Sequence, residues 1–81
     1  MNDDRAAIRH WLLTKFLPGE PETALLDHVS LREQGVLDSM GRILLVAFLE
    51  ERFGVRIEAY EADIEHLDTI SKIASLVQSK V

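Results

Sequence analysis

The sequence predicts an all-α fold, a bundle of four helices with a long loop between the first two helices and a short third helix. Three observations predict it. Apolar residues recur at spacings of three and four, glycine or proline follows two of the periodic segments, and the one segment that looks extended, 55–57, is too short to form a sheet. With 81 residues, 47% of them hydrophobic, the chain can enclose one core, so we expect a single domain over residues 1–81.

The first helix is expected to begin at a cap formed by Asp3 or Asp4 and to end near Leu17, before Pro18-Gly19. The residues that recur along its face are Ile8, Trp11, Leu12, Lys15 and Phe16. Trp11 is expected to pack in the core.

Segment 20–37 has no sustained apolar period, so we expect a long ordered loop. The scattered apolar residues expected to pin it are Leu25, Leu26, Val29 and Leu31. Loops of this length are uncommon and are usually functional.

The second helix is expected from Ser39 to Phe53, with Gly54 ending it. One of its sides carries Leu45, Val46, Leu49 and Phe53, and the opposite side carries Met40, Ile43, Leu44 and Ala47. Two interpretations of the second set stay open. A helix that is apolar all round is normally buried, whereas apolar residues left exposed beside Ser39 would form a docking surface for a partner.

Two aspartates are expected to cap the remaining helices. Asp63 would cap a brief helical turn through Leu67, and Asp68 would cap the last helix. The residues that share one face of that helix are Ile70, Ile73, Ala74 and Val77.

Composition excludes several classes of function. The net charge is 9 − 14 = −5, which disfavours nucleic acid because phosphate contacts need a basic patch. The chain contains no cysteine, so disulfides and thiolate ligands are excluded and a reducing compartment, the cytoplasm, is expected. The acidic start is no secretory signal, and the longest apolar run, Ile43–Leu49, is too short to span a membrane.

The sequence indicates no catalytic or metal site. A serine nucleophile needs a general base oriented by a third group, and the spacing of His10, His28 and His66 suggests neither a triad nor a metal centre. We therefore expect no enzyme activity. An acidic stretch contains Glu58, Glu61, Asp63, Glu65 and Asp68. It is either a solvated face or the complement of a basic patch on a partner.

The stretch Gly35-Val36-Leu37-Asp38-Ser39-Met40 resembles the prosthetic-group attachment site of acyl and peptidyl carrier proteins, whose form is G-x-[LD]-S-[LM]. Two further blocks carry the resemblance, which covers about Leu31 to Val77. They are Leu45, Leu49, Glu50, Phe53, Gly54, Val55 and Ile57, similar to L-x-x-x-L-E-x-x-F-G-v-x-I, and Leu67-Asp68-Thr69-Ile70, similar to F-[DS]-[ST]-[IV]. The pattern is closest to discrete peptidyl, aminoacyl or D-alanyl carriers.

The resemblance implies a covalent 4′-phosphopantetheine arm on Ser39, with Asp38 helping to position the modifying enzyme and Met40 at the root of the arm. The arm's thiol would hold an aminoacyl, peptidyl or acyl group as a thioester. The implied partners are a phosphopantetheinyl transferase, an adenylating ligase that loads the arm, and downstream transferases or tailoring enzymes. A helix start suits the phosphate of such an arm. The alternative is that Asp38 or Ser39 is simply an N-cap.

We therefore expect a monomeric carrier of a specialised pathway, such as nonribosomal peptide synthesis, a polyketide-like route or a dedicated aminoacylation. The start at Met1 favours a discrete protein. Fatty-acid carriers have carboxylates near the positions of Gly41 and Leu44, and their absence favours a partner with a less basic docking surface. The alternatives are an acyl carrier of fatty-acid or polyketide synthesis, a small helical adaptor without a prosthetic group, and a subunit of an enzyme whose catalytic groups lie on another chain.

Overall fold

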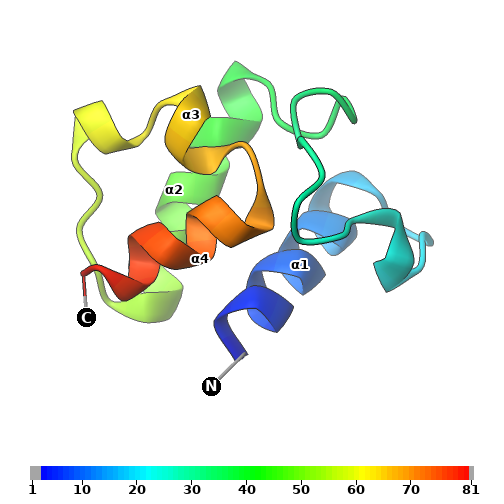
Figure 1. The fold of residues 1–81 in the computed structure, drawn as a ribbon, viewed down its shortest axis with the longest axis horizontal. Coiled ribbons are helices and arrows are strands. Elements are labelled where there is room, and N and C mark those ends of the chain that lie inside the picture. The colour runs from blue at the N-terminus through cyan, green and yellow to red at the C-terminus, as the bar shows by residue number, and fades with distance from the viewer. Residues whose placement is uncertain (1–2, 81) are drawn as a thin grey trace.

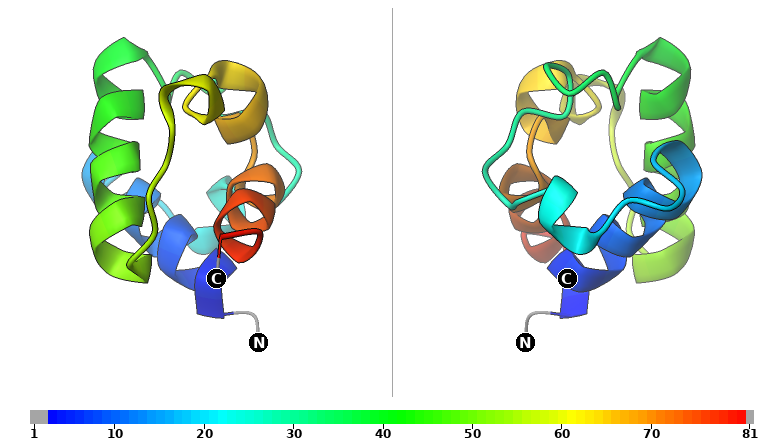
Figure 2. Two further views of the ribbon diagram at one scale, coloured as in Figure 1. Left: turned by 90° about the vertical axis from the view of Figure 1, so that its left-hand side faces the viewer. Right: turned by 90° about the vertical axis from the view of Figure 1, so that its right-hand side faces the viewer.

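The computed structural model describes residues 3–80, and within them it contains helices and no strand (Figure 1). The α-helices are α1 (Asp3–Phe16), α2 (Ser39–Phe53), α3 (Ile64–Leu67) and α4 (Ile70–Gln78). Two short 3₁₀ turns, η1 (Glu22–Ala24) and η2 (Ala59–Glu61), interrupt the connections. In Figure 2, α2 lies on one side of the molecule and α3 with α4 on the other, with α1 closing the end opposite α3. The predicted all-α bundle with a short third helix is confirmed.

The core forms where the apolar faces of these helices meet. Its fully buried large side chains are Ile8, Leu12, Leu25, Leu31, Leu45, Leu49, Leu67, Ile70, Ile73 and Val77. The predicted face of α4 is confirmed, since Ile70, Ile73, Ala74 and Val77 are all buried. On α2 the predicted core side is only partly enclosed, because Leu45 and Leu49 are buried whereas Val46 and Phe53 are half-buried.

A row of aromatic rings joins α1 to α2. Trp11 stacks on Phe48 with ring centroids 4.8 Å apart and meets the edge of Phe16 at 5.6 Å. Phe48 in turn meets Phe53 edge-on at 6.3 Å. Such pairs add stabilisation beyond the area they bury. The prediction that Trp11 packs in the core is confirmed, as a half-buried ring against it.

The expected cap of α1 is wrong. Asp3 is the first residue of the helix and Asp4 the second, so both lie within the helix rather than in front of it. The residue that precedes Asp3 lies outside the described part of the chain.

The long loop is ordered, as predicted, and its anchors are only partly those expected. Leu25 and Leu31 are fully buried, whereas Leu26 is 46% exposed and pins nothing. Asp27, which the sequence analysis did not single out, ties the loop to two helices. Its carboxylate accepts a 2.7 Å hydrogen bond from Arg5 of α1 and also pairs with Arg9, and its carbonyl accepts a 3.0 Å bond from the Ser71 N–H of α4.

Asp68 is a second anchor of the loop and not the cap of α4. Thr69 caps α4, because its hydroxyl accepts a 3.1 Å hydrogen bond from the Lys72 N–H. The Asp68 carboxylate instead accepts bonds from the Ser30 hydroxyl at 2.9 Å and the Arg32 N–H at 3.2 Å. Asp68 and Thr69 are both residue types that cap helices, and because Asp68 is bound to Ser30, Thr69 is the cap.

The predicted boundaries after residue 53 are otherwise confirmed. Gly54 ends α2 in the left-handed conformation at φ 66°, and its N–H bonds the Glu50 carbonyl. The Glu50 carboxylate then receives the Ile57 N–H at 2.8 Å, which holds segment 55–57 against α2. Asp63 caps α3 by accepting the His66 N–H at 2.9 Å.

Candidate functional site

The N-terminus of α2 presents Ser39 on the surface of the molecule. Asp38 is the N-cap, in an extended conformation at φ −103° and ψ −170°, and its carboxylate accepts a 2.7 Å hydrogen bond from the Gly41 N–H. The Asp38 carbonyl accepts the Arg42 N–H at 2.9 Å. Ser39 is therefore the first helical residue, and its side chain is exposed. The cap leaves the N–H groups of Ser39 and Met40 without an acceptor in the described chain, as expected for the first turn of a helix.

The turn before Asp38 fixes where the helix starts. Gly35 adopts φ 72°, and the chain then doubles back so that the N–H groups of Val36 and Leu37 donate to the Leu31 carbonyl at 2.9 and 3.3 Å. Val36 and Leu37 are buried. Because two core residues directly precede Asp38, the cap and the serine after it emerge at the surface in one defined position.

Gly41 allows α1 to approach this helix start closely. A Cβ atom on Gly41 would lie 3.1 Å from the Asp38 carboxylate, 3.2 Å from the Phe16 ring and 3.4 Å from the Val36 carbonyl oxygen. In the sequence, Gly41 stands out only as a place where fatty-acid carriers have a carboxylate, and nothing there predicts this packing. The glycine lets the cap, the preceding turn and α1 meet beneath Ser39.

The side of α2 that begins at Met40 is exposed. Met40 is 63% exposed, Ile43 64% and Leu44 37%, and Ala47 is also exposed. The interpretation of these four residues as core is therefore wrong, because the side of α2 that is buried carries Leu45 and Leu49. The first turn of α2 contains no acidic residue.

A groove of about 310 Å³ lies beside this exposed side. Its lining residues are Arg42, Ile43, Val46, Ala59 and Ala62. Arg42 belongs to no motif, and its one signal in the sequence is its spacing of three residues from Ser39, which makes the two residues neighbours on a helix.

Part of the acidic stretch is used within the fold, whereas Glu65 is exposed. The Glu61 carboxylate pairs with Lys80, and this hydrogen bond, with one from the Glu58 N–H, holds the pKa of Glu61 below its ordinary value. The His66 N–H, followed by its ring, lowers the pKa of the capping Asp63. Glu58 completes a capping box with Glu61. These carboxylates, like that of Asp68, are used within the fold.

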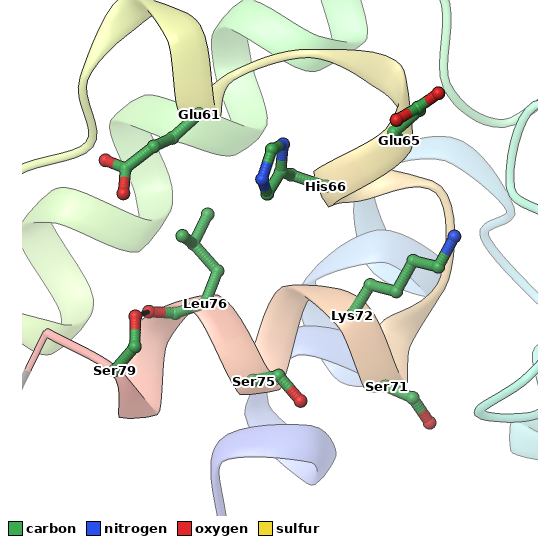
Figure 3. A pocket seen from close by; sticks show the side chains of 8 residues that line it. All are labelled: Glu61, Glu65, His66, Ser71, Lys72, Ser75, Leu76 and Ser79. Carbon is green, nitrogen blue, oxygen red and sulfur yellow. Dashed lines mark hydrogen bonds between the residues drawn. The ribbon is translucent and has the colours of Figure 1, made fainter.

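A hollow with a volume of about 750 Å³ lies between α4 and the segment from η2 to α3 (Figure 3). Polar side chains surround Leu76 there, and the His66 ring lies 2.7 Å from the Asp63 carboxylate. Residues 3–80 contain no group of three side chains placed to hold a metal ion, and no helix among them is long and apolar enough to cross a membrane. All three histidines are exposed, and none forms a hydrogen bond with Ser39 in the described structure.

Residues 17–77 match a protein-family model described as "Phosphopantetheine attachment site". The chain belongs to this family of phosphopantetheine carriers. Its relatives include the D-alanyl carrier protein of Lactococcus lactis subsp. cremoris, 42% identical over 52 residues, which are 64% of this chain and 66% of the relative. The aligned part thus spans about two thirds of that protein. D-alanyl carrier protein 1 of Lactiplantibacillus plantarum is 32% identical over 98% of this chain and 95% of its own length.

Among solved structures, this carrier is similar to a chain in the crystal structure of an FAD-dependent dehydrogenase. The TM-score is 0.75 at 30% identity, covering 86% of this carrier and 97% of that chain. Carriers of this family catalyse nothing themselves and bear a covalent 4′-phosphopantetheine. The expected family, cofactor and lack of catalysis are therefore confirmed.

The helix start fits the anionic end of such a group. It offers an exposed hydroxyl, two N–H groups without acceptors and the positive end of the α2 dipole, all of which favour a phosphodiester. When bound, the group supplies a thiol on which an acyl or aminoacyl cargo is held as a thioester. The chain has no cysteine of its own, so that thiol is the carrier's sulfur nucleophile.

Proposed function

We propose that Ser39 is the residue that bears the 4′-phosphopantetheine and that the carrier presents an aminoacyl group on it to partner enzymes. The observation that carries this proposal is the exposed Ser39 side chain at the capped start of α2. Asp38 holds that helix start through its bond to the Gly41 N–H. We propose that the same carboxylate helps to position the modifying transferase, and that Met40 lies at the root of the arm.

Two observations support an aminoacyl cargo over a fatty acyl cargo. The relatives at 42% and 32% identity are D-alanyl carrier proteins. The exposed side of α2 is apolar at Met40, Ile43, Leu44 and Ala47 and has no carboxylate in its first turn. Such a surface suits a partner whose own contact surface is apolar rather than strongly basic. We propose that an adenylating ligase activates the amino acid and transfers it to the arm.

The compartment follows from the chemistry of the arm. A thiol that must stay reduced to accept cargo persists where the redox poise is reducing. We therefore propose that the carrier works in the cytoplasm, where it serves a biosynthetic or aminoacylation pathway.

A second candidate role comes from the similarity to a chain in the structure of an FAD-dependent dehydrogenase. In this role a flavoenzyme oxidises the cargo while it is held on the arm, with a hydride passing to the flavin and a proton to the solvent or a base. The test is to incubate the loaded carrier with such a dehydrogenase and to measure the intact mass. Loss of one pair of hydrogens from the cargo supports the role, and an unchanged mass rejects it.

The attachment is tested with coenzyme A and a broad-specificity phosphopantetheinyl transferase. The intact mass of the wild type should rise by one phosphopantetheine group, Ser39→Ala should abolish the rise, and Ser75→Ala, which removes an exposed serine on α4, should leave it unchanged. A thiol reagent should label the protein only after conversion. A folded wild type that gains no mass would contradict the proposal and favour a helical adaptor.

The cargo is then identified by competition. The converted carrier is incubated with ATP, adenylating ligases and a panel of amino acids and fatty acids, and the thioester is read from its mass and its release by hydroxylamine. Preferential loading of amino acids is expected. Preferential loading of fatty acids would instead indicate an acyl carrier of fatty-acid or polyketide synthesis.

A further inference from the structure

Arg42 is placed to act on whatever is attached to Ser39. The two residues are three apart on α2, a spacing that makes side chains neighbours on the helix surface. Arg42 is the fourth residue of α2 and lines the groove together with Ile43 and Val46. Its side chain therefore lies on the flank of α2 that faces η2, about one helical turn from Ser39.

The charge of Arg42 is not neutralised within residues 3–80. Arg5 and Arg9 pair with Asp27, and Arg56 pairs with Glu58. The arginines without a carboxylate partner in the described chain are Arg32, Arg42 and Arg52. Of these, Arg32 and Arg52 are exposed, whereas Arg42 is half-buried. A half-buried guanidinium without a counter-ion is a ready partner for a phosphate, to which its planar fork can donate two hydrogen bonds.

The groove continues from Arg42 with apolar walls. Ile43 and Val46 form its α2 side, and the small side chains of Ala59 and Ala62 leave space on the other side. The prosthetic group has a matching order of chemistry, an anionic phosphodiester followed by a dimethyl-substituted segment and two amides. A cationic end followed by an apolar trough is complementary to that order.

We propose that Arg42 is a positioning residue that pairs with the phosphodiester on Ser39 and so biases the arm to lie in the groove between Ile43 and Val46 on one side and Ala59 and Ala62 on the other. This inference rests on the proposed attachment at Ser39. Arg42 takes no part in any bond-making step. It biases the position of the arm, and so of its thiol, while no partner enzyme is bound.

The absence of cysteine gives a direct test. A nitroxide reagent reacts with the thiol of the arm and with no side chain of the protein, because the chain contains no cysteine. Paramagnetic broadening of backbone amide signals then reports where the arm lies. The samples are the wild type, Arg42→Gln and the matched control Arg52→Gln, which removes a charge from the same helix about 15 Å from Arg42. Intact mass establishes that each sample carries the label.

In the wild type, the amides of Ala59 and Ala62 should be broadened more than those of α1 and α4. Arg42→Gln should reduce that excess by about twofold to fivefold, the range expected for a partly exposed ion pair. Raising NaCl from about 20 mM to about 500 mM should reduce it similarly in the wild type, because salt screens the pair. Arg52→Gln should behave as the wild type does.

Three results would overturn the inference. These are equal broadening in the wild type and Arg42→Gln, broadening that does not respond to salt, and an equal loss in both arginine variants. If Arg42→Gln resists modification, the salt series on the wild type alone decides. A wild type that gains no mass overturns the attachment at Ser39, and this inference with it, whereas a mass gain with unbiased broadening overturns only the role of Arg42.

Discussion

The Phe16 ring packs against Gly41 so closely that a Cβ atom there would lie 3.2 Å from its Cζ atom. The contact joins the last turn of α1 to the first turn of α2, beneath the exposed Ser39. It links the aromatic row of Trp11 and Phe48 to the helix start from which the arm is proposed to extend.

Gly41→Ala should therefore destabilise the protein although alanine is the better helix former. The propensity gain is about 1 kcal/mol, and crowding against Phe16, Asp38 and the Val36 carbonyl costs about 1–3 kcal/mol, so we expect a net loss of about 1 kcal/mol. Urea unfolding measures it. Combining Gly41→Ala with Phe16→Leu should cost less than the sum of the single changes, since the smaller side chain relieves the crowding. Strict additivity would show that the Phe16 contact is not the cause.

Asp68→Ala should loosen the loop that leads to Ser39. It removes the acceptor of the Ser30 hydroxyl and of the Arg32 N–H, so we expect a loss of about 1–3 kcal/mol in the free energy of unfolding. Hydrogen exchange should quicken in segment 30–37 more than in α4. Glu65→Ala, at an exposed position nearby, should change stability by less than about 0.5 kcal/mol. Equal effects of the two changes would contradict the anchoring role of Asp68.

Stability should fall in acid as the pair between Glu61 and Lys80 is lost. The pKa of Glu61 lies below its ordinary value of 4.5, chiefly because Lys80 donates to it, and the pKa of Lys80 is raised above 10.5 by the same bond. The ionised pair therefore stabilises the fold at neutral pH, and its contribution is lost as the pH falls from 4.5 through the lowered pKa.

Lys80→Gln should make this acid loss shallower and should raise the pKa of Glu61, as followed by thermal unfolding and by NMR titration of the carboxyl carbon. The matched change is Lys72→Gln, at an exposed lysine that lines the hollow of Figure 3 together with Glu61. It should leave the pKa of Glu61 unchanged. An unchanged acid limb in Lys80→Gln would show that the pair contributes nothing.

Ile43→Glu should weaken recognition without unfolding the protein. Ile43 is 64% exposed, so the free energy of unfolding should change by less than about 0.5 kcal/mol. A charge placed in an apolar contact typically costs about 1–2 kcal/mol, so the kcat/KM of a phosphopantetheinyl transferase for the carrier should fall about tenfold. Glu51→Gln, farther along the same exposed helix, is the control. Unchanged kinetics in Ile43→Glu would remove this residue from the docking surface.

Local signals in the sequence predicted the parts of the fold that depend on a few neighbouring residues. Asp63 was predicted as a cap, and Asp38 was one of two candidates for the cap of α2. Both could be found from the sequence because a cap accepts a hydrogen bond from an N–H only three residues away. The end of α2 at Gly54 could be predicted because glycine readily adopts the left-handed conformation that ends a helix. The buried face of α4 could be predicted from the spacing of its apolar residues. The prediction failed at Asp68, where a distant serine, Ser30, determines which residue caps α4.

The features of the site that the sequence could not settle depend on tertiary packing. A helix with apolar residues on both sides does not reveal which side its neighbours cover, and only the structure exposes Met40 and Ile43. Asp27 is one acidic residue in an aperiodic loop, so the sequence pattern does not predict its ion pairs with Arg5 and Arg9. The groove at Arg42 forms with Ala59 and Ala62, which lie 17 and 20 residues after Arg42 in the sequence, so no helical spacing relates them to it.

The hydrogen bonds at Asp27 and Asp68 hold the long loop that leads to Ser39 against the helices. Because the attachment point is held in this way, a thioester on the arm moves between enzymes by rotation about the bonds of the arm. The distance that cargo can be handed over is then fixed by tether length, and two enzymes whose active sites are spaced more widely can be served only if the whole carrier detaches and diffuses between them.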